Sequence, residues 1–340
     1  MTLVRERRHQ QALTLSLPAA AANHQFRRRR RHFPISNPTS PDVENISDLK
    51  KLTVLGHGNG GIVYKVGHQK SNSIYALKVL NTTSSTIIRH QAAHEAEILK
   101  RLDSQFIVKC HAVFYTIEGE ICFVMEHMER GSLFDSLRVR KKLSEDVISG
   151  VAYRVLKGLQ YLHGMQIIHG DIKPSNLLIN GKGEVKIADF GVSRIVEETR
   201  NNNNHINNNN NNNNNIGEAA IACMGTCAYM SPERVDSERW GGDYGFAGDV
   251  WSLGVVVLEC LVGHYPLIGF GEKPDLMALI CAICFGERLE MPETASPEFR
   301  RFVRSCLEKD WRKRGTVEEL LAYPFVTKRS SSSNIDGLII

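Results

Sequence analysis

The chain has 340 residues, of which 42% are apolar and 23% charged, with 27 Gly, 11 Pro and 8 Cys. This composition excludes a chain that is disordered throughout, a collagen-like repeat and a small disulfide-bonded scaffold. The net charge of +5 is concentrated at one end, because residues 1–34 hold eight Arg and one Glu while the rest is nearly neutral.

The first 45 residues are predicted to form a basic arm. They combine Arg clusters with a Pro- and Ser-rich stretch at 34–41 and show no sustained periodicity, which predicts disorder. No secretory signal is predicted, because polar residues and Pro18 break the apolar run at 12–22. A transit peptide stays open as an alternative, since the segment is rich in Arg and poor in acidic residues.

Short runs of apolar and β-branched residues between Gly and Asn predict a β-rich segment from about residue 50. The chain becomes helical after Gly131, most clearly at 144–163, where apolar residues recur along one face between Ser144 as N-cap and Gly164 as stop. This order predicts an α+β fold, with a small β-rich lobe before a larger helical lobe. The predicted strands are 52–55, 62–66, 74–80, 112–116 and 121–125, with one helix at about 88–102 among them.

No membrane span is predicted, and the cysteines indicate a reduced compartment. The longest apolar stretch, 250–262, is interrupted by Ser252 and Glu259 and is shorter than the roughly 18 residues that cross a bilayer. The 8 Cys are scattered without a repeated CxxC spacing, which favours small buried side chains. Cys281 and Cys284 could form half of a metal site, but nothing in the sequence supplies the other half.

An Asn-rich insertion interrupts the chain at 200–216. Thirteen residues between 201 and 215 are Asn, and such a tract can neither bury apolar area nor hold one conformation. We therefore expect an exposed, mobile loop, with self-association of the tract as the alternative. The Ser-rich end, 328–340, is expected to be another disordered segment.

A Gly-rich turn and a strand Lys together predict a phosphate-binding site. Gly56, Gly58 and Gly61 lie between two predicted strands, where backbone N–H groups can approach phosphate oxygens because no Cβ intervenes. Lys78 lies on the next strand and can pair with Glu95 of the following helix. Taken singly, these features also fit a plain hairpin and a solvated edge charge, so the prediction depends on their combination.

Two further motifs complete the pattern. They are HGDIKPSN at 169–176 and DFG at 189–191, and SPE follows at 231–233. In this order, after the Gly-rich turn and the strand Lys, they resemble the catalytic loop and the DFG segment of eukaryotic protein kinases. The resemblance implies a bilobal protein kinase fold. The implied limits are 46–327 for the domain, about 46–128 for the N-lobe and about 129–327 for the C-lobe.

The resemblance implies catalytic and metal-binding roles for the residues that match these motifs. Asp171 would accept or orient the proton of the substrate hydroxyl, and Lys173 would stabilise the phosphoryl group in transfer. Asn176 and Asp189 would bind Mg²⁺ through hard oxygen ligands. Phosphoryl transfer needs positioning and charge neutralisation more than covalent chemistry, which is why these few side chains suffice.

Nucleotide binding is implied for the β-rich lobe and the segment that follows it. Lys78, paired with Glu95, would bind the α- and β-phosphates of ATP. Met125 and the residues after it match the family's gatekeeper and hinge, whose backbone would bond to adenine. The implied nucleotide-binding residues are Leu55, Gly56, Gly58, Gly61, Val63, Ala76, Lys78, Met125, Glu126 and Met128.

Within the superfamily, three segments are similar to plant mitogen-activated protein (MAP) kinase kinases. They are GNGG at 58–61, MEHM at 125–128 and GTCAYMSPER at 225–234. The resemblance implies ATP and Mg²⁺ as cofactors and the Thr and Tyr of a MAP kinase activation loop as the substrate. An upstream kinase or a scaffold would be a further partner.

The basic arm is a separate indication of a MAP kinase partner. A basic cluster followed by alternating Leu is similar to MAP kinase docking peptides, in which Leu enters apolar pockets and Arg meets an acidic patch. A disordered arm that contains Leu by chance is the alternative. Arg27–Arg31 better matches a nuclear-import signal or a nonspecific basic segment. The predicted docking residues are Arg5, Arg7, Arg8, Leu13, Leu15 and Leu17.

Two departures from the family pattern concern activation. No hydroxyl side chain occurs between Thr199 and Thr226, where family members are normally phosphorylated. Gly170 stands where the family usually has the Arg that meets this phosphate. Because both partners of that contact are absent, we expect an enzyme that does not need activation-loop phosphorylation.

Two other functions stay open. The same departures fit a catalytically weak chain that acts as a docking scaffold or competitor in a MAP kinase cascade. Nucleic-acid binding by the arm has less support, because only Phe26 and Phe33 accompany its arginines. The expected location is the cytosol, with nuclear entry as an addition.

Overall fold

The computed structural model describes residues 43–58, 61–83, 85–196, 227–240, 245–268, 275–286 and 291–328. These residues all belong to one unit that spans 37–340. The predicted docking residues, the cluster Arg27–Arg31, the Asn-rich insertion and residues 329–340 lie outside the described residues.

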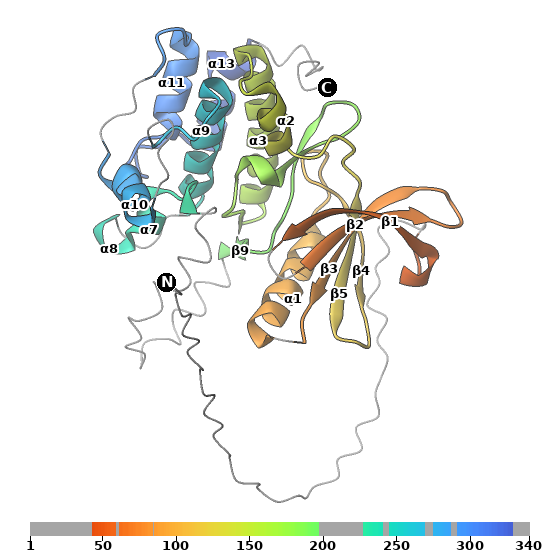
Figure 1. Cartoon of the computed structure of the whole chain (residues 1–340). Coiled ribbons are helices and arrows are strands. Elements are labelled where there is room, and N and C mark those ends of the chain that lie inside the picture. The colour runs from red at the N-terminus through yellow and green to blue at the C-terminus, as the bar shows by residue number, and fades with distance from the viewer. Residues whose placement is uncertain are drawn as a thin grey trace, which may run out of the picture. The chain divides into compact units, whose positions relative to one another are not determined.

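The N-terminal part of the described chain is a five-stranded antiparallel sheet with one long helix (Figure 1). The strands lie in the order β1-β2-β3-β5-β4, and α1 (Thr86–Arg101) packs against β4 and β5. All five predicted strands and the helix are confirmed; the strands are longer because backbone pairing continues past the apolar runs. They are β1 (Leu49–Gly58), β2 (Gly61–His68), β3 (Ile74–Asn81), β4 (Cys110–Tyr115) and β5 (Glu120–Glu126).

Alternation along β3 gives its two faces different surroundings. Tyr75 and Leu77 pack in an apolar cluster with residues of β2 and β5. Lys78 therefore lies on the opposite face, from which it reaches α1. Val43, which the sequence analysis assigns to the arm, is 2% exposed and packs in the same cluster as Tyr75, so the described fold includes the last residues of that arm.

The C-terminal part is mainly helical and surrounds α3 (Glu145–Gly164), which confirms the predicted helix. Ile148, Val151 and Val155 on its apolar face are fully or almost fully buried. Ser144 is the N-cap residue, although its side chain makes no capping hydrogen bond. The other helices are α2 (Leu133–Arg140), α7 (Pro232–Val235), α8 (Ser237–Trp240), α9 (Ala247–Val262), α10 (Leu276–Cys284), α11 (Pro297–Cys306), α12 (Val317–Leu321) and α13 (Pro324–Thr327).

The helix α9 contains the whole long apolar stretch of the sequence, 250–262. Twelve of its residues are buried, and it packs against α3 and α11, which explains why it is apolar on almost every side. None of the described helices is both long enough and apolar enough to span a membrane. The prediction of a small-lobe, large-lobe α+β fold is confirmed.

The cysteines follow the predicted core packing with one clear exception. Cys260, Cys284 and Cys306 are buried, whereas Cys281 is exposed, which corrects its expected position. On α10, the buried residues Leu279 and Ile283 are four positions apart and share one face, and Cys281 lies on the opposite face.

Two small antiparallel sheets and one short helix frame the loops between the two parts. One sheet joins β6 (Ile167–Ile168) to β9 (Arg194–Ile195), and the other joins β7 (Leu177–Ile179) to β8 (Val185–Ile187). A 3₁₀ helix, η2 (Pro174–Asn176), precedes β7. The two sheets hold the loop 169–173, which carries Asp171 and Lys173, and the loop 188–193, which carries Asp189, while Asn176 ends η2.

Candidate active site

Lys78, Glu95 and Asp189 form a cluster of charges from three separate elements. Lys78 Nζ, on β3, donates to Glu95 Oε1 of α1 at 2.7 Å and to Asp189 Oδ1, in the loop after β8, at 2.9 Å. The Lys78–Glu95 pair is thus formed as the sequence predicts, and Asp189 joins it. The side chain of Asp189 is 48% exposed, so its second oxygen is accessible to a ligand.

The protonation states of this cluster follow from its charges. Burial disfavours the ammonium of Lys78, but the carboxylates of Asp189 and Glu95 outweigh that cost and raise the pKa of Lys78. Burial also disfavours the Asp189 carboxylate, but Lys78 outweighs it and lowers the pKa of Asp189. Both groups are therefore charged at neutral pH, as binding of phosphate and a divalent cation requires.

The catalytic loop brings Asp171, Lys173 and Asn176 together. The amide nitrogen of Asn176 donates to Asp171 Oδ2 at 2.8 Å and to the Asp171 carbonyl at 2.9 Å, and Lys173 Nζ lies 2.8 Å from the same Oδ2. Because the Asn176 nitrogen faces Asp171, its amide oxygen is left as a candidate metal ligand. Asp171 Oδ1 is buried and has no hydrogen-bond partner in the part of the chain that the structure describes.

His169 holds this loop in place through both of its ring nitrogens. Nδ1 accepts the backbone N–H of Asp171 at 3.2 Å, so Nε2 carries the proton and donates to the Ala188 carbonyl at 3.1 Å. Burial lowers the pKa of His169, which keeps this neutral tautomer. The ring also packs edge-on against Phe190, with centroids 5.0 Å apart. His169 thereby links the catalytic loop to the segment that carries Asp189.

Asp189 has a strained backbone. Its φ is +66°, a left-handed conformation that costs a residue with a side chain about 1–2 kcal/mol. The neighbouring Phe190 is buried, which anchors the turn and aims the Asp189 carboxylate at Lys78. Such a strained position is typical of a functional site.

The predicted nucleotide-binding residues lie in register across the sheet. Gly56 pairs with Val63, Val63 pairs with Lys78, and Ala76 pairs with Met125, so four strands contribute to one region. Leu55, Gly58 and Gly61 lie at the β1–β2 end, and Glu126 and Met128 lie at and after the end of β5.

The segment after β5 is tied to the loop of Asp189. Met125 and Met128 pack with Ala188, which directly precedes Asp189. Glu126 accepts bonds from Lys186 of β8 at 2.7 and 2.8 Å. The structure thus brings the predicted catalytic, metal-binding and nucleotide-binding residues to one region, whereas the docking residues lie outside the described residues.

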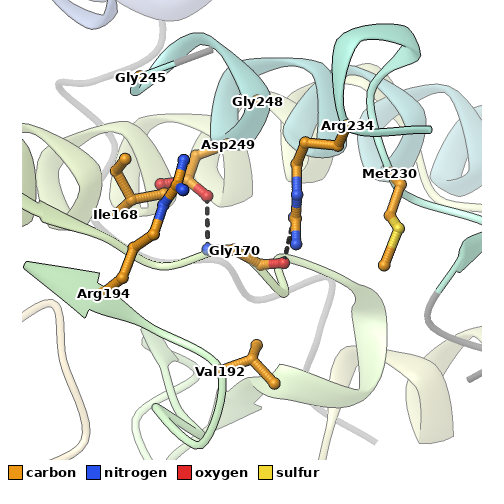
Figure 2. Close-up of a pocket in the computed structure, with 9 residues that line it drawn as sticks. All are labelled: Ile168, Gly170, Val192, Arg194, Met230, Arg234, Gly245, Gly248 and Asp249. Atoms are coloured by element: carbon orange, nitrogen blue, oxygen red, sulfur yellow. Dashed lines mark hydrogen bonds between the residues drawn. The ribbon is translucent and has the colours of Figure 1, made fainter. Parts of the chain in front are cut away.

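A pocket of about 240 Å³ lies directly beneath the catalytic loop (Figure 2). Asp249 of α9 accepts the N–H of His169 at 2.9 Å and that of Gly170 at 2.8 Å. Burial opposes the charge of Asp249, but bonds from His163 and the backbone lower its pKa. The residues around the pocket are Ile168, Gly170, Val192, Arg194, Met230, Arg234, Gly245, Gly248 and Asp249.

Sequence reasoning gave no role to two basic residues at this pocket. Arg234, on α7, donates to the carbonyl of Gly170, and Arg194 comes from β9 (Figure 2). Arg234 belongs to the segment 225–234 that carries the family resemblance, but its sequence neighbours do not indicate that its side chain reaches the catalytic loop. Only the packing of α7 beside that loop reveals the contact.

Comparisons with known proteins show the family to which the chain belongs. A family model of the protein kinase domain matches residues 49–326. Mitogen-activated protein kinase kinase 10 of Arabidopsis thaliana is 53% identical over 331 residues, which cover 97% of this chain and 100% of that protein. Mitogen-activated protein kinase kinases 9 and 7 of the same plant are 47% and 43% identical, and each match covers 96% of this chain and 99% of that protein. The chain is therefore a protein kinase and belongs, within that family, to the plant mitogen-activated protein kinase kinases.

Proposed function

We propose that this enzyme transfers the γ-phosphoryl group of ATP to the Thr and Tyr of a MAP kinase activation loop, without phosphorylation of its own activation loop. The observation that carries the proposal is the buried Oδ1 of Asp171, which has no partner in the described part of the chain. A buried acceptor without a donor is costly, and a substrate hydroxyl is the donor that this position would receive.

The chemistry follows from the positions of the side chains. The substrate hydroxyl oxygen attacks the γ-phosphorus, its proton moves to Asp171, and the bond to the oxygen that bridges the β- and γ-phosphates breaks. Lys173, 2.8 Å from Asp171, places a positive charge beside the group in transfer. Lys78 would bind the α- and β-phosphates while Glu95 keeps its ammonium in place.

Asn176 and Asp189 fit the Mg²⁺ that this family implies. Both supply hard oxygen donors, and the accessible carboxylate of Asp189 lies beside the Lys78 ammonium, which would bind the same phosphates. Mg²⁺, when bound, neutralises charge on the β- and γ-phosphates.

The assembled state of the charge cluster supports activity without a loop phosphate. In the chain as described, Lys78 already contacts Glu95 and Asp189, and His169 already joins Asp171 to Ala188. A kinase whose catalytic groups are in place does not need a new phosphate to bring them together. The absence of hydroxyl side chains between Thr199 and Thr226 is consistent with this.

The alternative function is that of a docking scaffold or competitor with weak catalysis. Gly170 favours it, because the family's usual link between a loop phosphate and the catalytic Asp is missing from the sequence. The basic arm would then be the functional part of the chain.

One experiment separates the two functions. Purified full-length protein is incubated with Mg-ATP and a panel of kinase-dead MAP kinases, with Asp189→Ala as the matched control. We expect phosphate on the activation-loop Thr and Tyr with the natural chain and a signal at least about a hundredfold lower with the control. Equal signals from both proteins would remove the proposed activity and leave the scaffold function.

A second experiment tests the partner proposed for the arm. Replacing Leu13, Leu15 and Leu17 by Ala removes the alternating apolar side chains but leaves the Arg cluster intact. We expect weaker MAP kinase binding in a pull-down with purified proteins and an unchanged rate on a short peptide substrate. Undiminished binding would show that the arm is not the contact, and salt-sensitive binding of RNA or DNA would assign the arm to nucleic acid instead.

A further inference from the structure

We infer that Arg234 is a positioning residue that fixes the catalytic loop at Gly170 through a contact that needs no phosphorylation. The inference rests on the proposed function and concerns how that activity is maintained. It assigns the positioning of the catalytic loop to a residue of α7. The family usually gives this task to an Arg at position 170 and a loop phosphate.

Both backbone polar groups of Gly170 are bonded to charged side chains (Figure 2). Its N–H donates to Asp249 Oδ1 at 2.8 Å, and its carbonyl accepts from Arg234 Nη1. Gly170 has a φ of +80°, and hydrogen bonds to charged groups are about twice as strong as neutral ones. Because Asp171 follows directly, the two bonds set the direction in which its carboxylate leaves the loop.

Arg234 is itself held by a rigid support. The preceding residue, Glu233, forms an ion pair with Arg314 at 2.7 Å, and both of these side chains are fully buried. The backbone N–H of Arg234 donates to the Ser231 carbonyl at 3.0 Å. The four-residue helix α7 therefore cannot shift without breaking a buried ion pair. The backbone from which the Arg234 side chain extends is held in place.

Two glycines leave room for this side chain. A Cβ on Gly248, in α9, would lie 3.4 Å from Cδ of Arg234 and 3.3 Å from Oγ of Ser231, so a larger residue would press on the stem of Arg234. A Cβ on Gly170 would lie 3.7 and 3.8 Å from the two terminal nitrogens of Arg234. The Val192 carbonyl oxygen would lie 3.4 Å from the same Cβ, so a long side chain at 170 would extend from a position already in contact with the guanidinium and with this carbonyl.

The residue types explain why the contact is permanent. A guanidinium does not lose its proton in proteins, so the bond from Arg234 to Gly170 forms without any modification. An Arg at position 170 would add a third guanidinium beside Arg194 and Arg234, where Asp249 is the one carboxylate among the pocket residues, and a loop phosphate would balance the added charge. A chain without a phosphorylation site in its activation loop is therefore better served by Gly than by Arg at position 170.

The test uses full-length Arg234→Met, which keeps the length of the side chain and removes its donors. Arg239→Met is the matched control, because Arg239 on α8 lies over Phe285 and away from the catalytic loop. We expect kcat to fall about ten- to a hundredfold in Arg234→Met with KM for ATP unchanged, since Lys78 and the sheet are untouched. We also expect faster backbone hydrogen exchange in the peptide 167–177, and wild-type values in the control.

Three companion variants keep the inference falsifiable if Arg234→Met folds poorly. Arg234→Lys retains the charge and should recover part of kcat. Gly248→Val retains Arg234 but should lower kcat, because its side chain extends past a Cβ that already lies 3.4 Å from Cδ of Arg234. Gly170→Arg restores the residue usual in the family, yet we expect it to lower kcat. A rise in kcat with Gly170→Arg would overturn the inference, because it would show that the chain lacks its positioning residue.

Exchange and activity distinguish this inference from the proposed function. If Arg234→Met exchanges residues 167–177 at the wild-type rate, Arg234 does not fix the loop, whatever the activity. If exchange is faster but kcat is unchanged, the contact exists without a role in catalysis, and the inference is also overturned. If the natural chain shows no phosphoryl transfer, the proposed function fails, while the exchange experiment still decides whether Arg234 holds the loop.

Discussion

Two ion-pair clusters in this enzyme, each made of basic and acidic side chains, have the same shortest nitrogen–oxygen distance but very different exposure to solvent. The shortest nitrogen–oxygen distance is 2.7 Å both between Lys78 and Glu95 and between Arg314 and Glu233. The Arg314–Glu233 pair is fully buried, whereas Lys78 is 23% exposed and its second partner, Asp189, is 48% exposed. Charges that stay accessible can exchange one partner for a ligand, and charges that are enclosed can only hold structure.

The hydrogen bonds that Arg314 donates show that the buried cluster has a structural role. Besides Glu233, its guanidinium donates to the backbone carbonyls of Ala247, at the start of α9, and of Glu308 and Lys309, just after α11. No position in that network is left for a ligand among the described residues. Lys78, in contrast, donates hydrogen bonds to two side-chain carboxylates and lies over the Phe123 ring among the described residues, and a phosphate can replace one of the carboxylates.

The largest expected effect is on stability, at the buried pair. Arg314→Met leaves the Glu233 carboxylate buried without a partner, so we expect the free energy of unfolding to fall by about 3–5 kcal/mol. Urea denaturation measures it, with exposed Arg312→Met as the control. The double variant Arg314→Met, Glu233→Met should lose less than the single one. A single variant as stable as the natural chain would contradict the structural role of this pair.

The next effect is on activity, at the accessible cluster. Lys78→Met should lower kcat/KM about 10²–10³-fold, because it removes a charge that binds the phosphates. Its stability should change far less than that of Arg314→Met, since burial already raises the pKa of Glu95 and lets this carboxyl take a proton when Lys78 is gone. Steady-state kinetics and urea denaturation on the same protein test both parts. If Lys78→Met lost as much stability as Arg314→Met, both clusters would have a structural role and the contrast between them would be wrong.

A buried group that stays neutral gives a third, pH-dependent test. Burial lowers the pKa of His169 in the folded enzyme below the ordinary 6.5 of the unfolded chain. As pH falls through 6.5, the unfolded state takes up a proton that the folded state does not, so stability is lost, by at most about 1.4 kcal/mol per pH unit. The difference in unfolding free energy between the natural chain and His169→Phe, measured from pH 8 to about pH 5, should show this slope. A difference that stays constant with pH would mean that the pKa of His169 is the same in the folded and unfolded chain.

The smallest effect is expected at a partly exposed pair, Lys186 and Glu126, whose side chains are 13% and 25% exposed. Lys186 bonds to Glu126 and ties β8 to the segment that would contact adenine. Because such pairs contribute about 0.5–1 kcal/mol at most, Lys186→Met should raise KM for ATP about two- to fivefold and leave kcat unchanged. An effect as large as that of Lys78→Met would show that this pair matters as much as the charge that binds the phosphates.

Much of the fold was predictable because it depends on patterns among residues that are close together in the sequence. The face of α3 with Ile148, Val151 and Val155 repeats at helical spacing, and the runs that became β1 to β5 lie between turn residues. The helix α2 was not singled out, although its capping box of Ser132 and Asp135 was present in the sequence. Strands as short as β6 and β9, with two residues each, have no period to recognise.

The sequence by itself determined the kinase family, the order of the elements and the identity of the chemical groups, because motifs and periodicity are local properties. Apart from the Lys78–Glu95 pair, which the sequence predicts, only the tertiary structure decided which groups meet. Lys78 and Asp189 are 111 residues apart, Gly170 and Asp249 are 79 apart, and Gly170 and Arg234 are 64 apart. Contacts over such separations depend on how helices and strands pack, and on whether a glycine leaves room for a side chain to pass, which no stretch of neighbouring residues encodes.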